Sequence, residues 1–113
     1  MFSERVRTRL QDIVDDVDRV GKYLGDVDAD GFVRDEKTVL VIERLFQRIT
    51  EAVIQIGADD MARIGGDIPI AQIRGFGNRL RHDYRDIDPR LLFTTARTQL
   101  PALRAAAMRA LES

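Results

Sequence analysis

The sequence predicts an all-α fold, an antiparallel bundle of four to five helices, on three observations. Apolar residues recur at helical spacing along most of the chain, and segments rich in Gly, Asp or Pro interrupt that spacing. No segment shows the period-two alternation of a β-strand. Because 113 residues suffice for one hydrophobic core but not for two, residues 1–113 are expected to form a single domain.

The first half of the chain predicts a helical hairpin. Residues 6–24 and 39–56 carry apolar side chains at intervals of three and four, which places them on one stripe of each helix. The other faces of the first helix are expected to carry Asp12, Asp15, Asp16 and Arg19. Residues 25–31 are rich in turn formers, and Asp35 is expected to cap the second helix. The two helices should therefore pack antiparallel.

The second half predicts two more helices. The glycines at positions 65 and 66 interrupt the apolar pattern, and Pro69 is expected in the first turn of a third helix. Asp88 followed by Pro89 predicts the capped start of a fourth helix, which extends to Leu111. Pro101 lies inside that last pattern and is expected to kink the helix or divide it in two.

Composition excludes several classes of function. The 18 basic residues nearly balance the 19 acidic ones, so any contact with nucleic acid must come from a local patch. The chain has no Cys, which removes thiolate metal sites and a Cys nucleophile and suits a reducing cytoplasm. It has no apolar run of membrane-spanning length and no signal-peptide pattern, so we expect a soluble, cytoplasmic protein.

The densest group of side chains that can do chemistry lies in residues 74–85, which contain four Arg and the only His of the chain, His82. On a helix, Asn78 and Arg79 lie one turn before His82, so amide, guanidinium and imidazole can share a face. An imidazole can transfer a proton near neutral pH, and a guanidinium can stabilise charge on a phosphate. The alternative is a partly buried polar His beside a solvated Arg face. A lone His without spaced His or Cys partners does not predict a metal site.

This segment resembles the HepT-like toxin family of the HEPN superfamily. The order and spacing of the family signature are matched without a gap by Ile68, Pro69, Ile73, Gly75, Asn78, Leu80, His82, Tyr84 and Asp88. Positions elsewhere that resemble the family are Leu10, Asp12, Ile13, Tyr23, Phe32, Asp35, Glu51, Ala52, Leu100 and Pro101. The resemblance covers nearly the whole chain and implies a dimeric helical bundle.

The resemblance implies a metal-independent endoribonuclease, without a cofactor, that cleaves RNA at the interface of a homodimer. Two copies of His82 would meet there, one accepting the 2′-hydroxyl proton and the other protonating the leaving oxygen. Asn78 and Arg79 would orient the scissile phosphate. The arginines left to contact other RNA phosphates are Arg74, Arg81 and Arg85.

The resemblance also implies a protein partner. HepT-like toxins pair with a minimal nucleotidyltransferase antitoxin of the MntA type, which blocks toxicity by adding AMP to the Tyr two residues after the His. That residue is Tyr84 in this chain. Attached adenylate would place negative charge and bulk beside His82 and obstruct an RNA phosphate. The alternative is that Tyr84 is a core or interface residue.

The chain departs from the family pattern at Gly77, where the family has an Arg directly before the Asn. Arg79 is too close to His82 in sequence to fit the family spacing, although it can reach the same helix face. Loss of a charge that stabilises the transition state costs roughly 100-fold or more in rate. A catalytically silent HEPN protein that acts as the binding partner of a nucleotidyltransferase is therefore the alternative function.

A second motif, in residues 26–37, imitates a calcium-binding EF-hand loop. Asp26, Asp28 and Asp30, followed by Gly31, match its first positions. The twelfth position should supply a bidentate Glu and is Lys37, which puts a positive charge where the main ligand belongs. The acidic stretch is therefore expected to be a solvated turn between two helices.

Overall fold

The computed structural model describes residues 1–65, 68, 70–82 and 87–113, and for Arg81 and His82 it describes the backbone only. Within these residues it contains helices and no strand, so the all-α prediction is confirmed. The helices are α1 (Glu4–Leu24), α2 (Ala29–Arg34), α3 (Glu36–Ile56), α4 (Ala58–Ile64), α5 (Ile70–His82) and α6 (Pro89–Glu112). None of the described helices is long and apolar enough to cross a membrane.

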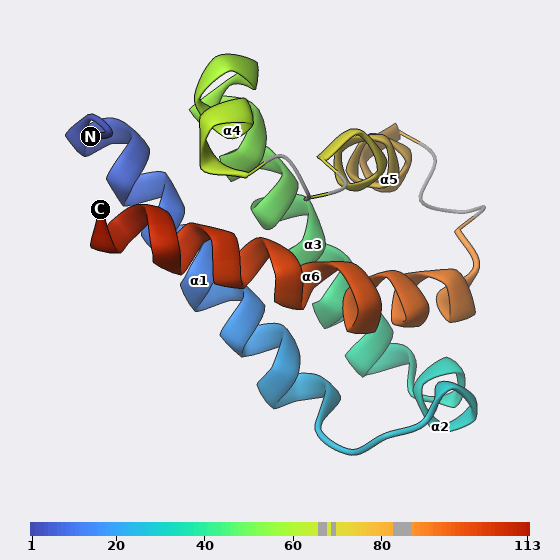
Figure 1. Ribbon diagram of the computed structural model, residues 1–113. Coiled ribbons are helices and arrows are strands. Elements are labelled where there is room, and N and C mark those ends of the chain that lie inside the picture. The colour runs from blue at the N-terminus through green and yellow to red at the C-terminus, as the bar shows by residue number, and fades with distance from the viewer. Residues whose placement is uncertain (66–67, 69, 83–86) are drawn as a thin grey trace.

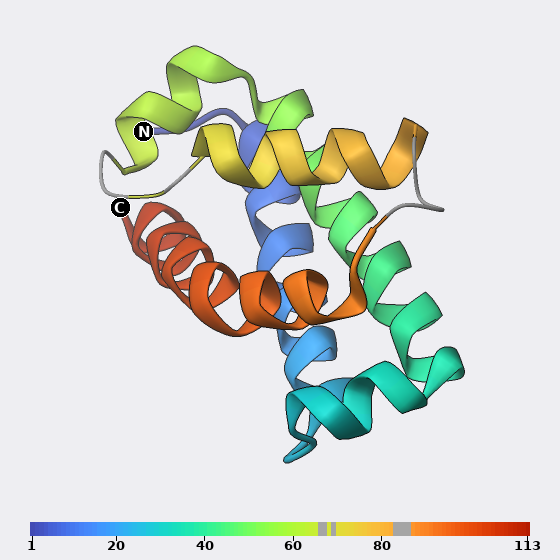
Figure 2. The ribbon, with the colours of Figure 1, turned by 90° about the vertical axis from the view of Figure 1, so that its right-hand side faces the viewer.

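The helices α1 and α3 form the antiparallel hairpin that the sequence predicts, and α6 crosses this hairpin (Figure 1). The last helix packs mainly on α1, whereas α5 packs on α3. Figure 2 shows α5 at the end of the bundle opposite to α2, and both chain ends on the same side. The predicted apolar seams of both hairpin helices are buried between these layers.

Two helix starts have the predicted caps, at Asp35 and Asp88, and a third has a cap that was not predicted. The Asp35 carboxylate accepts hydrogen bonds from the Thr38 amide at 3.2 Å and the Thr38 hydroxyl at 2.7 Å. At α6, Asp88 accepts from the Arg90 amide at 2.9 Å, and Pro89 occupies the first turn. The Ser3 hydroxyl accepts from the Val6 amide and caps α1.

Two short helices were not predicted. Residues 25–31, expected to be only a turn, contain the start of α2, because the Asp28 carboxylate caps it by accepting from the Gly31 amide at 2.8 Å. Gly57 ends α3 with a φ of 94°, a backbone conformation that favours glycine, and α4 begins directly after it. Each helix is shorter than three turns, too short for a periodic pattern to reveal.

Of the two effects predicted for Pro101, a division of the helix does not occur, because α6 continues through this residue; the kink stays a prediction. Proline removes one helical hydrogen bond, which leaves the carbonyl of Arg97 without that donor. Both residues are exposed, so water can satisfy the carbonyl, and the apolar face of α6 continues through buried Leu100 and Leu103. The predicted start of α5 at Pro69 lies outside the described residues, and the helix begins at Ile70.

Candidate functional site

On α5, the described site residues and the residues that pack into the core lie on different faces of the helix. Its buried face consists of Ile73, Phe76, Gly77 and Leu80. Phe76 meets Phe46 of α3 edge-on, with ring centroids 5.1 Å apart, which fixes how α5 lies on α3. Asn78 and Arg79, in contrast, are exposed. The helix therefore presents an amide and a guanidinium side by side to solvent.

His82 is the last residue of α5, one turn after Asn78 and Arg79. The side chains of His82 and Arg81 lie outside the described part of the chain, as do Tyr84 and Arg85 altogether. The backbone thus brings Asn78 and Arg79 to the turn that carries the His, as the sequence predicts. The placement of the imidazole, and the roles predicted for Arg81, Tyr84 and Arg85, stay predictions.

Arg74 lies apart from this turn. It is exposed, and eight residues of helix separate it from His82, which is about 12 Å along the axis. It borders a cavity of about 300 Å³ between α3, α4 and α5, whose apolar walls include Met61, Ile68 and Ile70. Within one chain, Arg74 is therefore too distant to share a phosphate with His82.

Gly77 faces α3 and not the solvent. A Cβ atom at this position would lie 2.2 Å, 2.3 Å and 2.5 Å from Oγ1, Cγ2 and Cβ of Thr50. Thr50 is fully buried, and its hydroxyl donates to the Phe46 carbonyl at 3.0 Å, so it cannot move aside at low cost. Thr50 therefore fills the space that any side chain at position 77 would need.

Two polar residues of α3 beside the last turn of α5 were not singled out from the sequence. The Gln47 amide donates to the Leu80 carbonyl at 3.3 Å and ties this turn to α3. Glu43 lies one turn earlier on the same side of α3, and burial raises the pKa of its carboxyl. The sequence feature that could have identified Glu43 and Gln47 is their spacing of four residues, which places them on one face of the helix beside its apolar seam. Gln47 can form hydrogen bonds beside the turn that ends in His82, whereas only the carboxyl of Glu43 can take up or release a proton.

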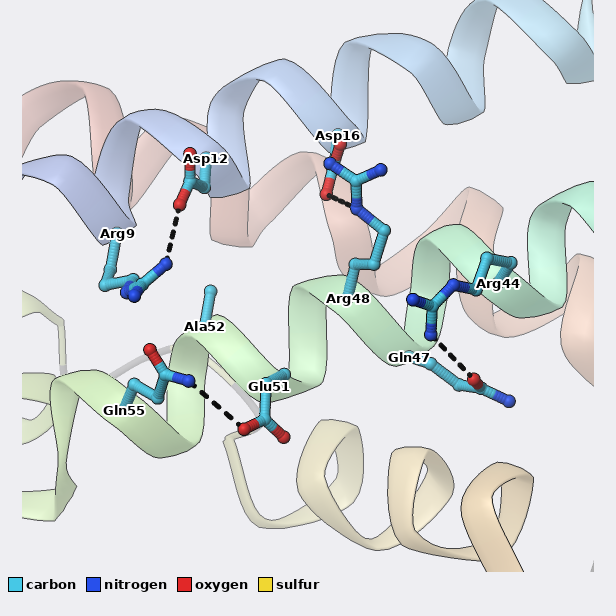
Figure 3. Close-up of a pocket in the computed structure, with 9 residues that line it drawn as sticks. All are labelled: Arg9, Asp12, Asp16, Arg44, Gln47, Arg48, Glu51, Ala52 and Gln55. Carbon is cyan, nitrogen blue, oxygen red and sulfur yellow. Dashed lines mark hydrogen bonds and ion pairs between the residues drawn. The ribbon is translucent and has the colours of Figure 1, made fainter.

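A polar groove of about 410 Å³ separates α1 from α3 on the side that Figure 3 shows. Arg9 and Asp12 of α1 pair at 3.2 Å, and Asp16 receives Arg48 of α3 at 3.1 Å. The side chain of Asp16 is only 3% exposed, contrary to its predicted place on an outer face. Arg19, at 2.6 Å, and Arg48 together supply the positive charges that a buried carboxylate requires.

The acidic turn of residues 26–30 uses its carboxylates within the fold. Asp28 caps α2, and Asp30 forms an ion pair with Arg90 at the start of α6. The side chains that the structure describes contain no group of three or more His, Cys, Asp or Glu residues arranged to hold a metal ion. The turn therefore joins α2 to α6, and nothing in its geometry supports a calcium loop.

Comparisons with known proteins identify the family. The model of the family "Ribonuclease HepT-like" matches residues 13–110. The chain belongs to the HepT-like ribonuclease family. It is similar to a protein of Thermococcus cleftensis named "Probable ribonuclease HepT", with 26% identity over 95 residues, 84% of this chain and 86% of that protein. No solved structure matches the chain.

Membership in the HepT-like family confirms the resemblance that the sequence signature carried. The matched residues begin in α1 and end in α6, so they include α5 and the turn with His82. The match covers most of both proteins, so it concerns the whole bundle and not a shared fragment.

Proposed function

We propose that this HepT-like protein is a metal-independent endoribonuclease that acts as a homodimer in the cytoplasm. His82 serves as general acid and general base, with one copy from each protomer, and Asn78 and Arg79 orient the scissile phosphate. One imidazole takes the proton of the 2′-hydroxyl as that oxygen attacks phosphorus. The other protonates the 5′-oxygen that leaves.

The observation that carries this proposal is the exposed Asn78–Arg79 pair on the turn that ends in His82, in a chain of the HepT-like ribonuclease family. Neither side chain belongs to the core that the described residues form, so both can contact a ligand. Arg79 lies one turn from His82 and can supply part of the charge that the missing motif Arg would supply. Arg74, Arg81 and Arg85 would contact flanking RNA phosphates.

Regulation follows from Tyr84, which lies two residues after His82. We propose that a minimal nucleotidyltransferase of the MntA type acts as the antitoxin and transfers AMP to the Tyr84 hydroxyl. The added phosphate would repel the RNA backbone next to His82, and the adenosine would occupy its space. Co-expression of the two proteins followed by mass spectrometry tests this step, since a Tyr84→Phe variant should not gain the mass of one adenylate.

A second candidate function is a silent partner of the nucleotidyltransferase, and the packing of Gly77 against Thr50 favours it. Position 77 has no room for the motif Arg, so a substitution of Gly77 alone would not restore that charge. Such a protein would still bind and receive AMP, but it would not degrade RNA.

Cleavage of a mixed RNA pool in excess EDTA tests the two functions against each other. The nuclease hypothesis predicts cleavage by the parent protein that is lost in His82→Ala. The silent-partner hypothesis predicts no cleavage by the parent protein. Restoring the Arg needs the double variant Thr50→Gly with Gly77→Arg, since Gly77→Arg alone would clash with Thr50. Equal cleavage by the parent and His82→Ala would refute the proposed mechanism.

A further inference from the structure

A second cavity, of about 480 Å³, continues the polar groove along α1 and α3 toward residue 23. Its apolar walls include Tyr23 and Leu40, which are 50% and 56% exposed and are among the most exposed large apolar side chains described. Its rim consists of Arg19, Arg44 and Arg48. We call it the arginine-rimmed pocket. Among the residues that the structure describes, no carboxylate lines it.

The buried carboxylate of Asp16 holds two arginines of the rim in place, Arg19 and Arg48. Asp16 contacts Nη1 of Arg19 at 2.6 Å and Nε of Arg48 at 3.1 Å, yet its own side chain is 3% exposed. Each guanidinium has five N–H donors, so both retain donors for a ligand, and each remains half exposed. Arg44 has no described ion pair and adds an unneutralised charge. The pocket therefore carries fixed positive charge around an apolar, partly aromatic wall.

We propose that the arginine-rimmed pocket holds a nucleotide of single-stranded RNA, with its base against Tyr23 and Leu40 and its phosphates against Arg19, Arg44 and Arg48. Aromatic and apolar surfaces that accept a base, flanked by arginines that follow the backbone, are the elements of sequence-tolerant single-strand binding. This inference rests on the proposed function, because it extends the substrate of the α5 site.

The pocket is linked to the α5 site through α3. Arg44 donates to the Gln47 side chain at 3.5 Å, and Gln47 donates to the Leu80 carbonyl in the last turn of α5. Figure 3 shows Arg44 and Gln47 next to each other on α3 at one end of the polar groove. An RNA strand at the His82 turn would therefore meet Arg44 next and the Tyr23 wall after it.

Charge decides which part of the surface the RNA uses. The other end of the polar groove contains Asp12 and Glu51, and its arginine, Arg9, is paired with Asp12. Because Asp12 already takes up the charge of Arg9, that end offers a polyanion less positive charge than the arginine-rimmed pocket. The charged side chains that line the arginine-rimmed pocket in the described part of the chain are all positive, so the strand should turn toward Tyr23 and not toward Arg9. A protein partner could also pack against the apolar wall of this pocket, and the test below distinguishes a protein occupant from RNA.

The test measures binding of a labelled, 2′-O-methylated single-stranded RNA of about twelve nucleotides, a length typical of such sites. The methyl group blocks the attacking hydroxyl, so binding is read without cleavage. Tyr23→Ala should raise the Kd about 5-fold or more. Arg44→Gln should make the negative slope of log affinity against log salt shallower by about 0.7, the value for one lost single-strand phosphate contact.

Matched controls remove the same chemistry from α6. Leu91→Ala deletes another exposed apolar side chain, and Arg109→Gln deletes another exposed charge. Both controls should leave the Kd and the salt slope unchanged, and circular dichroism should show all four variants folded. Equal losses in Arg44→Gln and Arg109→Gln would overturn the proposal, because binding would then be diffuse. Absence of RNA binding by the parent protein would overturn it as well.

The outcomes also separate this inference from the proposed function. Cleavage that depends on His82 but has the same KM in Tyr23→Ala would overturn the pocket and leave the nuclease standing. Binding that depends on Tyr23 and Arg44 without any cleavage would support the pocket and refute the nuclease. If Tyr23→Ala instead converts dimers to monomers in light scattering and leaves the RNA Kd unchanged, the surface is an interface between copies, and the proposal is wrong.

Discussion

Replacing Gly77 by Ala should destabilise the protein, although the same change usually stabilises a helix. Ala is about 1 kcal/mol better than Gly inside a helix. At position 77, however, the new Cβ would lie 2.2–2.5 Å from three atoms of Thr50. Carbon atoms in contact normally lie about 3.5–4.0 Å apart, so α3 and α5 would have to separate by roughly 1 Å or more. Overpacking of this kind costs about 1–3 kcal/mol, which exceeds the gain in helix propensity.

Urea unfolding followed by far-ultraviolet circular dichroism gives the free energies of unfolding. Gly75 supplies the matched control, because it lies on the same helix and a Cβ there meets nothing within 4 Å. Gly75→Ala should therefore raise the free energy of unfolding by about 0.5–1 kcal/mol, while Gly77→Ala should lower it. Equal stabilisation by both changes would refute the close packing of α5 on Thr50.

A double-mutant cycle locates the clash. Thr50→Gly removes all three contacting atoms, so Gly77→Ala should no longer destabilise the protein in that background. Thr50→Ala leaves the Cβ atom at 2.5 Å, so in that background the penalty should persist in part. A penalty that does not depend on residue 50 would mean that other atoms cause it.

Three further predictions concern buried or helix-interior groups. Asp16→Asn should lower the free energy of unfolding by about 1.5–3 kcal/mol, because two arginines lose the negative charge that they share and one of them loses its acceptor oxygen. Asp12→Asn, at an exposed pair, should lower it by less than about 1 kcal/mol, and thermal melts compare the two variants. Burial raises the pKa of Glu43, so the folded state is stabilised below the ordinary carboxyl pKa and loses this contribution as the pH rises through the raised value. The free energy of unfolding of Glu43→Gln, relative to that of the parent protein, should therefore rise between acidic and neutral pH. A difference between the two proteins that does not change with pH would contradict this. Pro101→Ala should raise the free energy of unfolding in urea by up to about 3 kcal/mol, because Ala restores an N–H donor inside α6 and favours the helix; an unchanged free energy would contradict this.

The helix pattern of the long elements could be predicted because one physical effect dominates there. In α1, α3 and α6 the apolar residues repeat over at least five turns, so burial decides the structure and the caps at Asp35 and Asp88 only place the ends. The short helices α2 and α4 depend on a single cap or a single positive φ, at Asp28 and Gly57, and no periodic signal announces them.

The candidate site could be predicted only in part, since helix spacing gives neighbours along α5 but not across to α3. Asn78 and Arg79 are on the expected exposed face, one turn from His82. The contribution of α3, through Gln47 and Glu43, depends on which residues of two helices meet, and that register is set by packing. Asp16 illustrates the same limit, since two arginines were needed to bury a charge that periodicity places outside.

The missing motif Arg shows why a family pattern must be considered together with the packing around it. Gly77 shares the buried stripe of α5 with Ile73 and Leu80, so an Arg at this position would start between α5 and α3 and reach the His82 turn only along that contact. Thr50 occupies the space such an Arg would leave through. Residues 50 and 77 therefore act as one unit, and a return to the family chemistry requires both to change. If RNA is cleaved by the present pair, the charge at the phosphate must come from exposed side chains such as Arg79 and not from position 77.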